Sequence, residues 1–178
     1  MVIRKAEIED IPAIEKVQVA SWQSTYAGMV ADEFLASLSY EEHAQMWQNA
    51  LSSSANQVSL YVAETPDGSL VGFAAGGPER TGDSAWTGEI YAIYLLQSQQ
   101  RRGVGSLLLK ALVGELVERG LTPLLVWVLR ANPACRFYER LQGKYVREKE
   151  IEIGCQRLTE VAYGWEDAQT FGVAGNLS

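Results

Sequence analysis

The spacing of hydrophobic residues divides the first third of the chain into one strand and several helices. Residues 1–6 alternate between apolar and polar side chains, as a half-buried strand does. Apolar residues then follow helical spacing from Ile11 to Trp22, and Asp10 stands where a helix cap is expected. A second helical stretch begins near Asp32. A capping box at Ser39–Glu42 predicts a third helix, which would end at about Leu51.

Strands dominate from residue 58 onward. β-rich runs separated by turn signals predict six of them, at 58–64, 70–75, 89–95, 124–129, 144–153 and 157–165. Pro66-Asp67-Gly68 forms the turn of the first hairpin, which is expected to end at the glycines that follow residue 75. The last two strands are expected to form a closing antiparallel hairpin, and residues 166–178 a loosely held tail.

A long amphipathic helix lies between the strands expected at 89–95 and 124–129. Leu108, Leu112 and Leu116 recur every four residues, and Gly120 is a typical helix stop. A strand–helix–strand crossover joins parallel neighbours, so these two strands are expected to be parallel. Residues 1–165 are therefore predicted to form one mixed α/β domain.

Composition narrows the classes of function. The 178 residues include 15 Lys plus Arg and 22 Asp plus Glu, which gives a net charge of −7 and a poor match for nucleic acid. Two separated cysteines and a single histidine, His43, argue against a metal site and against a disulfide framework. No run is apolar and long enough for a signal peptide or a membrane span, so a cytoplasmic protein without membrane contact is expected.

A short glycine-containing segment joins the strand at 89–95 to the long helix. Gly103 and Gly105 permit positive φ angles and the close approach of a ligand to the backbone. Free N–H groups at a helix start favour an anion, and Arg101 and Arg102 add positive charge at the same place. The segment therefore predicts a phosphate or pyrophosphate site.

Several kinds of loop share this composition. A Walker A loop requires GxxxxGK[ST], which this chain lacks. A dinucleotide fingerprint requires GxGxxG, whereas Leu108 stands at the position of its third glycine. A tight strand–helix turn that holds no ligand is the alternative that glycine spacing alone leaves open.

Three segments stand in a characteristic order: Glu89–Leu95, Gln100–Gly105 and Asn132–Gly143. Together they resemble the GNAT superfamily of N-acetyltransferases, whose central motif is Gln/Arg-x-x-Gly-x-Gly/Ala between a strand and a helix. Gln100-Arg101-Arg102-Gly103-Val104-Gly105 matches that motif, and the last segment resembles the family's Asn…Phe-Tyr…Gly run. One local departure is Leu141-Gln142-Gly143, where family members usually have Leu-Gly-Phe or Leu-Gly-Gly.

The resemblance implies a fold, a donor and a set of cofactor contacts. The fold would be a mixed, mostly antiparallel sheet of six to seven strands flanked by helices, with one parallel pair splayed at the cofactor site. The donor would be acetyl-CoA, and no metal would be needed. Its pantetheine arm and pyrophosphate would contact Ile93, Tyr94, Leu95, Gln100, Arg101, Arg102, Gly103, Val104, Gly105, Ser106 and Asn132.

It also implies an acid and a base for direct acetyl transfer to a primary amine. Tyr138 matches the family's general acid, which protonates the departing thiolate. Glu89 lies on the strand where some members carry a general base, and a water chain is the alternative. Trp22, Tyr26 and Tyr91 are expected to line the acceptor pocket.

The acceptor itself is not fixed by these motifs. It would be an amine of a small molecule, a peptide or a protein, and a homodimer is common in this architecture. A non-catalytic module that binds or senses acyl-CoA on the same fold is the alternative function. Such a module could dispense with both Tyr138 and Glu89.

Overall fold

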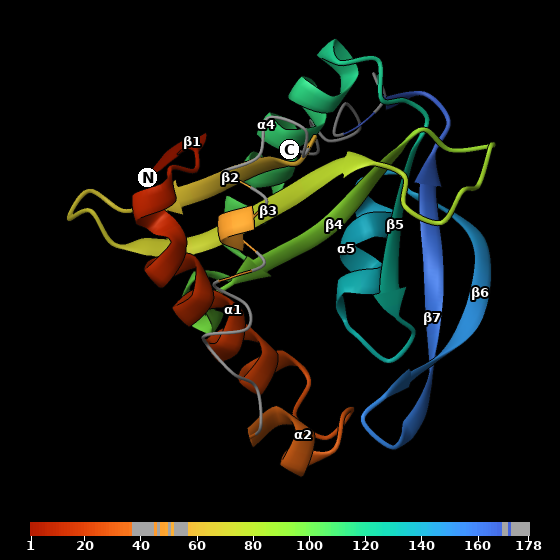
Figure 1. The fold of residues 1–178 in the computed structure, drawn as a ribbon, viewed down its shortest axis with the longest axis horizontal. Coiled ribbons are helices and arrows are strands. Elements are labelled where there is room, and N and C mark those ends of the chain that lie inside the picture. The colour runs from red at the N-terminus through yellow and green to blue at the C-terminus, as the bar shows by residue number, and fades with distance from the viewer. Residues whose placement is uncertain (37–44, 46, 50, 52–56, 169–170, 172–178) are drawn as a thin grey trace.

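The computed structural model describes residues 1–36, 45, 47–49, 51, 57–168 and 171. Within them, seven strands form one sheet in the order β1-β2-β3-β4-β5-β7-β6 (Figure 1). All neighbouring strands are antiparallel except β4 and β5, which are parallel, so the predicted mixed sheet with one parallel pair is confirmed. The strands are β1 (Val2–Lys5), β2 (Ser59–Glu64), β3 (Leu70–Pro78), β4 (Gly88–Leu95), β5 (Leu124–Leu129), β6 (Lys144–Ile153) and β7 (Gln156–Trp165).

Helices cover both faces of this sheet. α1 (Ile11–Thr25) packs across β3 and β4 on one face, and α2 (Asp32–Ala36) follows it near the turn between β6 and β7 (Figure 1). α4 (Val104–Glu118) lies on the opposite face against β2, β3 and β4, and α5 (Ala134–Arg140) lies against β5. None of the helices described is long and apolar enough to cross a membrane.

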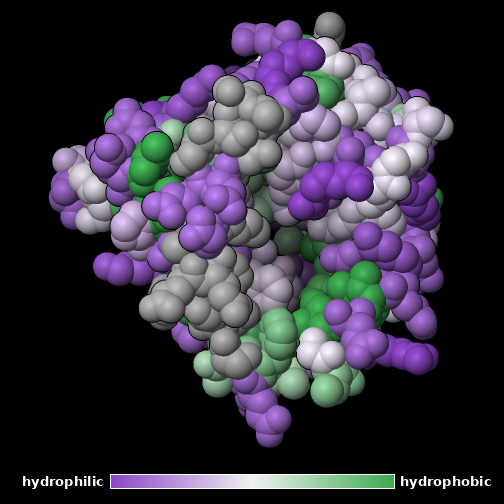
Figure 2. Space-filling model, in the orientation of Figure 1, coloured by the Kyte–Doolittle hydropathy of each residue, from purple (hydrophilic) through white to green (hydrophobic). Residues whose placement is uncertain are grey.

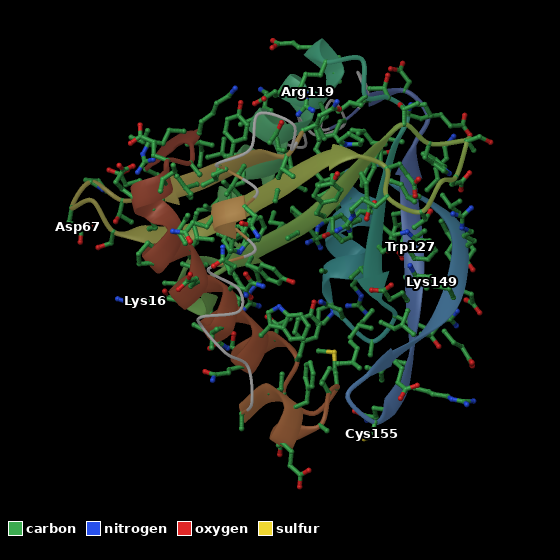
Figure 3. All side chains as sticks on the ribbon, viewed as in Figure 1. Lys16, Asp67, Arg119, Trp127, Lys149 and Cys155 are labelled. Carbon is green, nitrogen blue, oxygen red and sulfur yellow. The ribbon has the colours of Figure 1, made fainter. Side chains whose placement is uncertain are left out.

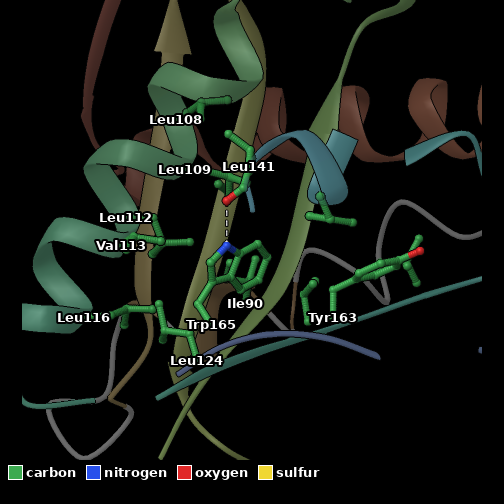
Figure 4. Close-up of a cluster of buried hydrophobic side chains, with 14 of the residues drawn as sticks. Ile90, Leu108, Leu109, Leu112, Val113, Leu116, Leu124, Leu141, Tyr163 and Trp165 are labelled. Atoms are coloured by element: carbon green, nitrogen blue, oxygen red, sulfur yellow. Dashed lines mark hydrogen bonds between the residues drawn. The ribbon is translucent and has the colours of Figure 1, made fainter. Parts of the chain in front are cut away.

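Each face of the sheet has its own hydrophobic core. Beneath α4, the Trp165 indole N–H donates to the Leu141 carbonyl oxygen at 2.7 Å, which ties the end of α5 to β7 (Figure 4). Beneath α1, the Trp47 ring meets the edge of Phe73, and its N–H donates to Gln18 Oε1 at 2.8 Å. The leucines predicted at helical spacing are among the fully buried residues of the α4 core, which include Leu108, Leu109, Leu112, Leu116, Leu124 and Ile90.

β4 carries one residue more than the partner strand β3. Ala75 pairs with Ala92, but the next residue, Gly76, pairs with Ile90, so Tyr91 has no partner. Such a β-bulge shifts the alternation of side chains by one position. Ile90 therefore joins the core beneath α4, whereas Tyr91 and Ala92 both pack against the core beneath α1.

β3 is longer than its sequence indicates. The glycines at 76 and 77 were expected to end the hairpin, but β3 continues through both to Pro78. A Cβ at Gly76 would lie 2.8 Å from the carbonyl oxygen of Glu89, so the two strands approach here more closely than another residue would permit. The glycines therefore serve close strand packing rather than a turn.

Asp10 does not cap α1, contrary to the sequence-based expectation. It ends the 3-10 helix η1 (Ile8–Asp10), and its carboxylate accepts hydrogen bonds from the Arg4 guanidinium at 2.7 Å and from the backbone N–H of Glu7 at 2.8 Å. The Arg4 hydrogen bond holds the pKa of the Asp10 carboxyl below its usual range. Asp10 therefore joins the start of α1 to β1.

Two further expectations concern segments that are described only in part. The capping box at Ser39–Glu42 and His43 lie outside the described residues, although residues 45, 47–49 and 51 are helical. In the predicted tail, Ala168 is buried and the Phe171 ring packs on Trp165 with ring centroids 4.9 Å apart. These tail residues therefore contribute to the core beneath α4.

Trp165→Phe is expected to lower the free energy of unfolding by about 2–3 kcal/mol, because it leaves the Leu141 carbonyl without a donor and opens a void in the core. Tyr145→Phe is the matched control. Because Tyr145 is 57 % exposed, removal of its hydroxyl should change the free energy of unfolding by less than about 0.5 kcal/mol. Urea unfolding followed by circular dichroism measures both. Equal unfolding midpoints in the two variants would contradict the role of this hydrogen bond.

Candidate functional site

β4 and β5 pair over only three residues and then separate. Gly88–Ile90 faces Leu124–Val126, but β4 continues to Leu95 and β5 to Leu129. Side chains from both strands line a cavity of about 150 Å³ in the gap. Figure 2 shows this face of the molecule hollowed near its centre, with hydrophobic surface along the lower rim.

Backbone groups of β4 face this gap. The Leu96 N–H donates to the Val71 carbonyl oxygen of β3 at 2.9 Å. Because N–H and C=O groups of successive residues in an antiparallel ladder point to alternate sides, Leu95 and Ile93 direct theirs away from β3. Tyr94 directs its own groups toward β3, so two of the three predicted positions present their backbone to the gap.

The carbonyl oxygen of Leu95 already has donors within the chain. The Ser21 hydroxyl of α1 donates to it at 3.0 Å, and the Gln100 side-chain amide donates at 3.3 Å. The predicted cofactor residue Gln100 therefore fixes the loop after β4 to the strand. The backbone N–H of Leu95 and the backbone N–H and C=O of Ile93 therefore remain for hydrogen bonds to a ligand in the gap.

The loop after β4 leads through the 3-10 helix η2 (Gln97–Gln99) to the start of α4. Arg101 and Gly103 have positive φ angles of 58° and 81°. The first residues of α4 have no intrahelical acceptor for their N–H groups. The side chains of Arg101, Arg102 and Ser106 are exposed beside those groups. The arrangement suits an anion, as the glycine spacing predicted.

Gly105 serves a different purpose from Gly103. A Cβ on Gly105 would lie 3.2 Å from the Leu95 side chain and 3.3 Å from the Phe137 ring, whereas a Cβ on Gly103 would meet open space. Gly105 therefore lets α4 approach β4 and α5 closely. Gly103 supplies the left-handed backbone of the turn.

The predicted acceptor residues meet in the cavity between β4 and β5. Trp22 and Tyr26 come from the end of α1, with ring centroids 4.6 Å apart, and Tyr91 comes from the bulge of β4. Tyr138 and Asn132 line the same cavity from the opposite side of the gap. Five residues from three separate sequence segments are thus brought together.

Tyr138 reaches the cavity from the core beneath α4. Its ring packs edge-on against Trp165, and burial raises the pKa of its hydroxyl, so the hydroxyl is protonated at neutral pH. Within the described part of the chain no hydrogen bond to this hydroxyl is found. Asn132 Oδ1 accepts the backbone N–H of Ala134 at 2.9 Å, so this side chain also stabilises the start of α5.

Two further residues of the cavity were not predicted from the sequence. Trp127 of β5 and Glu160 of β7 both line it, and among the lining residues that the structure describes Glu160 is the one charged side chain. Neither belongs to a recognisable motif. Only the pairing of β5 with β7, in which Leu129 faces Glu160, places this carboxylate at the gap.

Glu89 lies in an adjoining pocket of about 280 Å³, which shares Tyr91, Trp127 and Glu160 with the first cavity. It is 2 % exposed, and Arg80 engages both of its carboxylate oxygens, with Nη2 2.6 Å from Oε1 and Nε 3.2 Å from Oε2. The backbone N–H of Arg80 also donates to Oε2 at 3.2 Å. The predicted base is therefore the anchor of a charged pair.

The loop between β3 and β4 holds Arg80 in place. Burial lowers the pKa of Arg80, but the Glu89 carboxylate outweighs burial and raises it, so the guanidinium stays charged and stacks 3.9 Å above the Tyr91 ring. Further along the loop, Asp83 forms an ion pair with Arg147 of β6, and Trp86 covers the backbone at residue 164 of β7. This loop therefore forms a fixed wall of the second pocket.

No group of three or more His, Cys, Asp or Glu side chains that could hold a metal ion is found in the part of the chain that the structure describes. Cys135 and Cys155 are both free thiols, and burial raises the pKa of Cys135.

Glu89→Gln is expected to lower the free energy of unfolding by about 2 kcal/mol, because the buried carboxylate that accepts charge-assisted hydrogen bonds from Arg80 is lost. Glu64→Gln is the control, because Glu64 also contacts an arginine, Arg4 at 2.7 Å, but lies nearer the surface. This substitution should lower the free energy of unfolding by less than about 1 kcal/mol. Guanidinium chloride titrations compare the two. A smaller loss in the Glu89 variant would contradict the anchoring role.

Comparison with known proteins relates most of the chain to acetyltransferases. The model of the Acetyltransferase (GNAT) family matches residues 19–143. The chain is 39 % identical over 165 residues to the uncharacterized N-acetyltransferase YuaI of Bacillus subtilis (strain 168), with 93 % of this chain and 92 % of that protein covered. It is 26 % identical over 132 residues to the spermidine N(1)-acetyltransferase of Thermoplasma acidophilum, with 73 % and 79 % covered.

A solved structure shares the fold. The PaiA N-acetyltransferase of Thermoplasma acidophilum, in complex with coenzyme A, matches with a TM-score of 0.69 and 23 % sequence identity. The match covers 89 % of this chain and 96 % of that one.

Proposed function

We propose that this chain, which belongs to the GNAT family and is an N-acetyltransferase, moves an acetyl group from acetyl-CoA directly to a primary amine. The observation that carries the proposal is the separation of β4 from β5 in front of a helix start that suits an anion. A buried, protonated tyrosine reaches into the same gap. A donor site and a proton donor are thus combined.

The gap fits the chemistry of acetyl-CoA. The molecule supplies an activated thioester at the end of an arm built from amides. Backbone groups of Ile93 and Leu95 would pair with that arm as a strand pairs with a neighbour. The N–H groups from Arg101 to Ser106 would hold the pyrophosphate, with the two arginine side chains adding charge. Asn132 would border the reactive end.

Tyr138 would act on the sulfur side of the reaction. A thiolate that forms in the buried cavity is poorly solvated, so its affinity for a proton rises along with that of the tyrosine. The Tyr138 hydroxyl has no hydrogen bond to any other described residue and can donate to the sulfur. It would thereby stabilise the charge that develops as the carbon–sulfur bond breaks.

The acceptor would enter beside Trp22, Tyr26 and Tyr91. Aromatic faces with one carboxylate, Glu160, favour an aminoalkyl group that carries positive charge. This environment and the spermidine acetyltransferase among the relatives support testing spermidine early. Lysine-containing peptides, amino acids and aminoglycosides complete an acceptor panel. A protein that binds acetyl-CoA tightly but releases no coenzyme A with any of these amines would instead be a sensing module.

Gly103→Val is expected to weaken acetyl-CoA binding by about tenfold or more, because a β-branched residue strains the left-handed turn that aims the N–H groups at the pyrophosphate. Gly120→Val is a closely matched control. Gly120 has a φ of 71°, is equally open and lies at the other end of the same helix. Calorimetric titration should show the loss in the first variant alone. Equal affinities in both variants would contradict the pyrophosphate assignment.

Tyr138→Phe is expected to lower kcat by about 100-fold and to leave the affinity for acetyl-CoA within about twofold, because only the proton donor is lost. Tyr163→Phe removes a neighbouring hydroxyl that donates to Glu139 at 2.9 Å and should retain most activity. Release of coenzyme A, followed with a thiol reagent, measures both variants. An unchanged kcat in the Tyr138 variant would remove its assigned role.

A further inference from the structure

Two carboxylates border the space in front of Tyr138, and the proposed transfer requires a proton to leave the amine. We propose that Glu160 of β7, rather than Glu89 of β4, takes that proton. The inference rests on the proposed function and concerns the same cavity. It follows from where each carboxylate points and what already surrounds it.

Glu160 lies at the junction of the two pockets. Its side chain is 22 % exposed and lines both the cavity that contains Tyr138 and the pocket that contains Arg80. Tyr26 and Glu160 line the same cavity, and the nearby charge of Glu160 adds to burial in raising the pKa of the Tyr26 hydroxyl. An amine in the Tyr138 cavity would therefore have Glu160 as its charged neighbour.

Glu89 is placed differently. It lines the second pocket but not the cavity of Tyr138. Both of its oxygens accept hydrogen bonds from Arg80, and protonating it would break the contact that keeps Arg80 above the Tyr91 ring. Glu89 is therefore suited to building the pocket wall, and poorly suited to gaining a proton in every turnover.

Lys149 completes the surroundings of Glu160. Its ammonium group lies 3.4 Å from Glu160 Oε2 and 3.9 Å from the centre of the Trp127 ring. Figure 3 shows Lys149 and Trp127 near each other. At 3.4 Å the lysine partly balances the charge and leaves the other oxygen of Glu160 for an amine. The titratable and charged groups that share the two pockets with Glu160 are Tyr26, Arg80, Glu89, Tyr91, Tyr94, Tyr138 and Lys149.

Glu160 and Tyr138 together account for the proton transfers that accompany the bond changes. The ammonium form of the acceptor gives one proton to Glu160, and the freed nitrogen lone pair forms the new carbon–nitrogen bond. The carbon–sulfur bond breaks with its electron pair on sulfur, which gains a proton from Tyr138. The nitrogen then gives its second proton to Tyr138, and Glu160 returns its proton to water.

The test is the pH dependence of Glu160→Gln, measured as release of coenzyme A with the best amine of the panel. Without a base, only acceptor molecules whose amine is already neutral can react. Below the pKa of an alkylamine, about 10.4, the neutral fraction of the amine rises tenfold with each pH unit. We expect kcat/KM at pH 7 to fall on the order of 100-fold, and the loss to shrink steadily between pH 7 and 9. Acetyl-CoA affinity should stay within about twofold of the wild type.

Three variants separate this role from a structural one. Glu160→Asp, which keeps a carboxylate, should restore part of the activity at pH 7. Glu89→Gln should raise KM for the amine and leave the pH profile parallel to that of the wild type. Glu150→Gln, which removes an exposed charge from β6, should have no effect.

Each outcome bears on a different claim. A Glu160→Gln profile parallel to the wild type would overturn the assignment, as would a pH-dependent loss confined to Glu89→Gln. If the wild-type protein released no coenzyme A with any amine, the proposed function itself would be overturned. If the wild type were active and Tyr138→Phe impaired, the proposed function would stand whatever Glu160→Gln did.

Discussion

Every backbone N–H and C=O group needs a hydrogen-bond partner, and the rest of this structure depends on that constraint. The ladder between β4 and β5 stops after Ile90 and Val126, so the polar groups beyond that point must be satisfied in other ways. Ser21 and Gln100 both donate hydrogen bonds to the Leu95 carbonyl oxygen. The remaining groups of the edge form the surface against which a ligand with amide groups can lie.

Packing on both sides keeps the two strands apart. α1 supplies Trp22 and Tyr26 to the gap from one face, and α5 supplies Tyr138 from the other. In the proposed site, the donor would lie against main-chain groups of β4. The acceptor would lie against side chains of β4, β5 and β7, beside a loop that is fastened to β6 through Asp83.

The sequence predicts which aromatic residues meet in the gap, but not which charged residues stand beside them, for physical reasons. Glycine spacing, helical periodicity and the crossover rule are local signals, and they located the glycine-containing turn before α4 and the parallel pair. The place of Glu160 depends on β7 lying between β5 and β6, a pairing of residues far apart in the chain. Arg80 and Glu89 likewise meet only because β3 runs on through two glycines that a local reading takes for a turn.

The unpaired Tyr91 sets the phase of β4. Upstream of it, the side chain of Glu89 faces the second pocket; downstream, Ile93 and Leu95 direct their amides into the gap. With one residue fewer, one of these two halves would be turned over: either the carboxylate would enter the hydrophobic core beneath α4, or the amides would face β3. A version of this strand transplanted from a relative must therefore preserve the number of residues from Glu89 to Leu95, whatever side chains it brings.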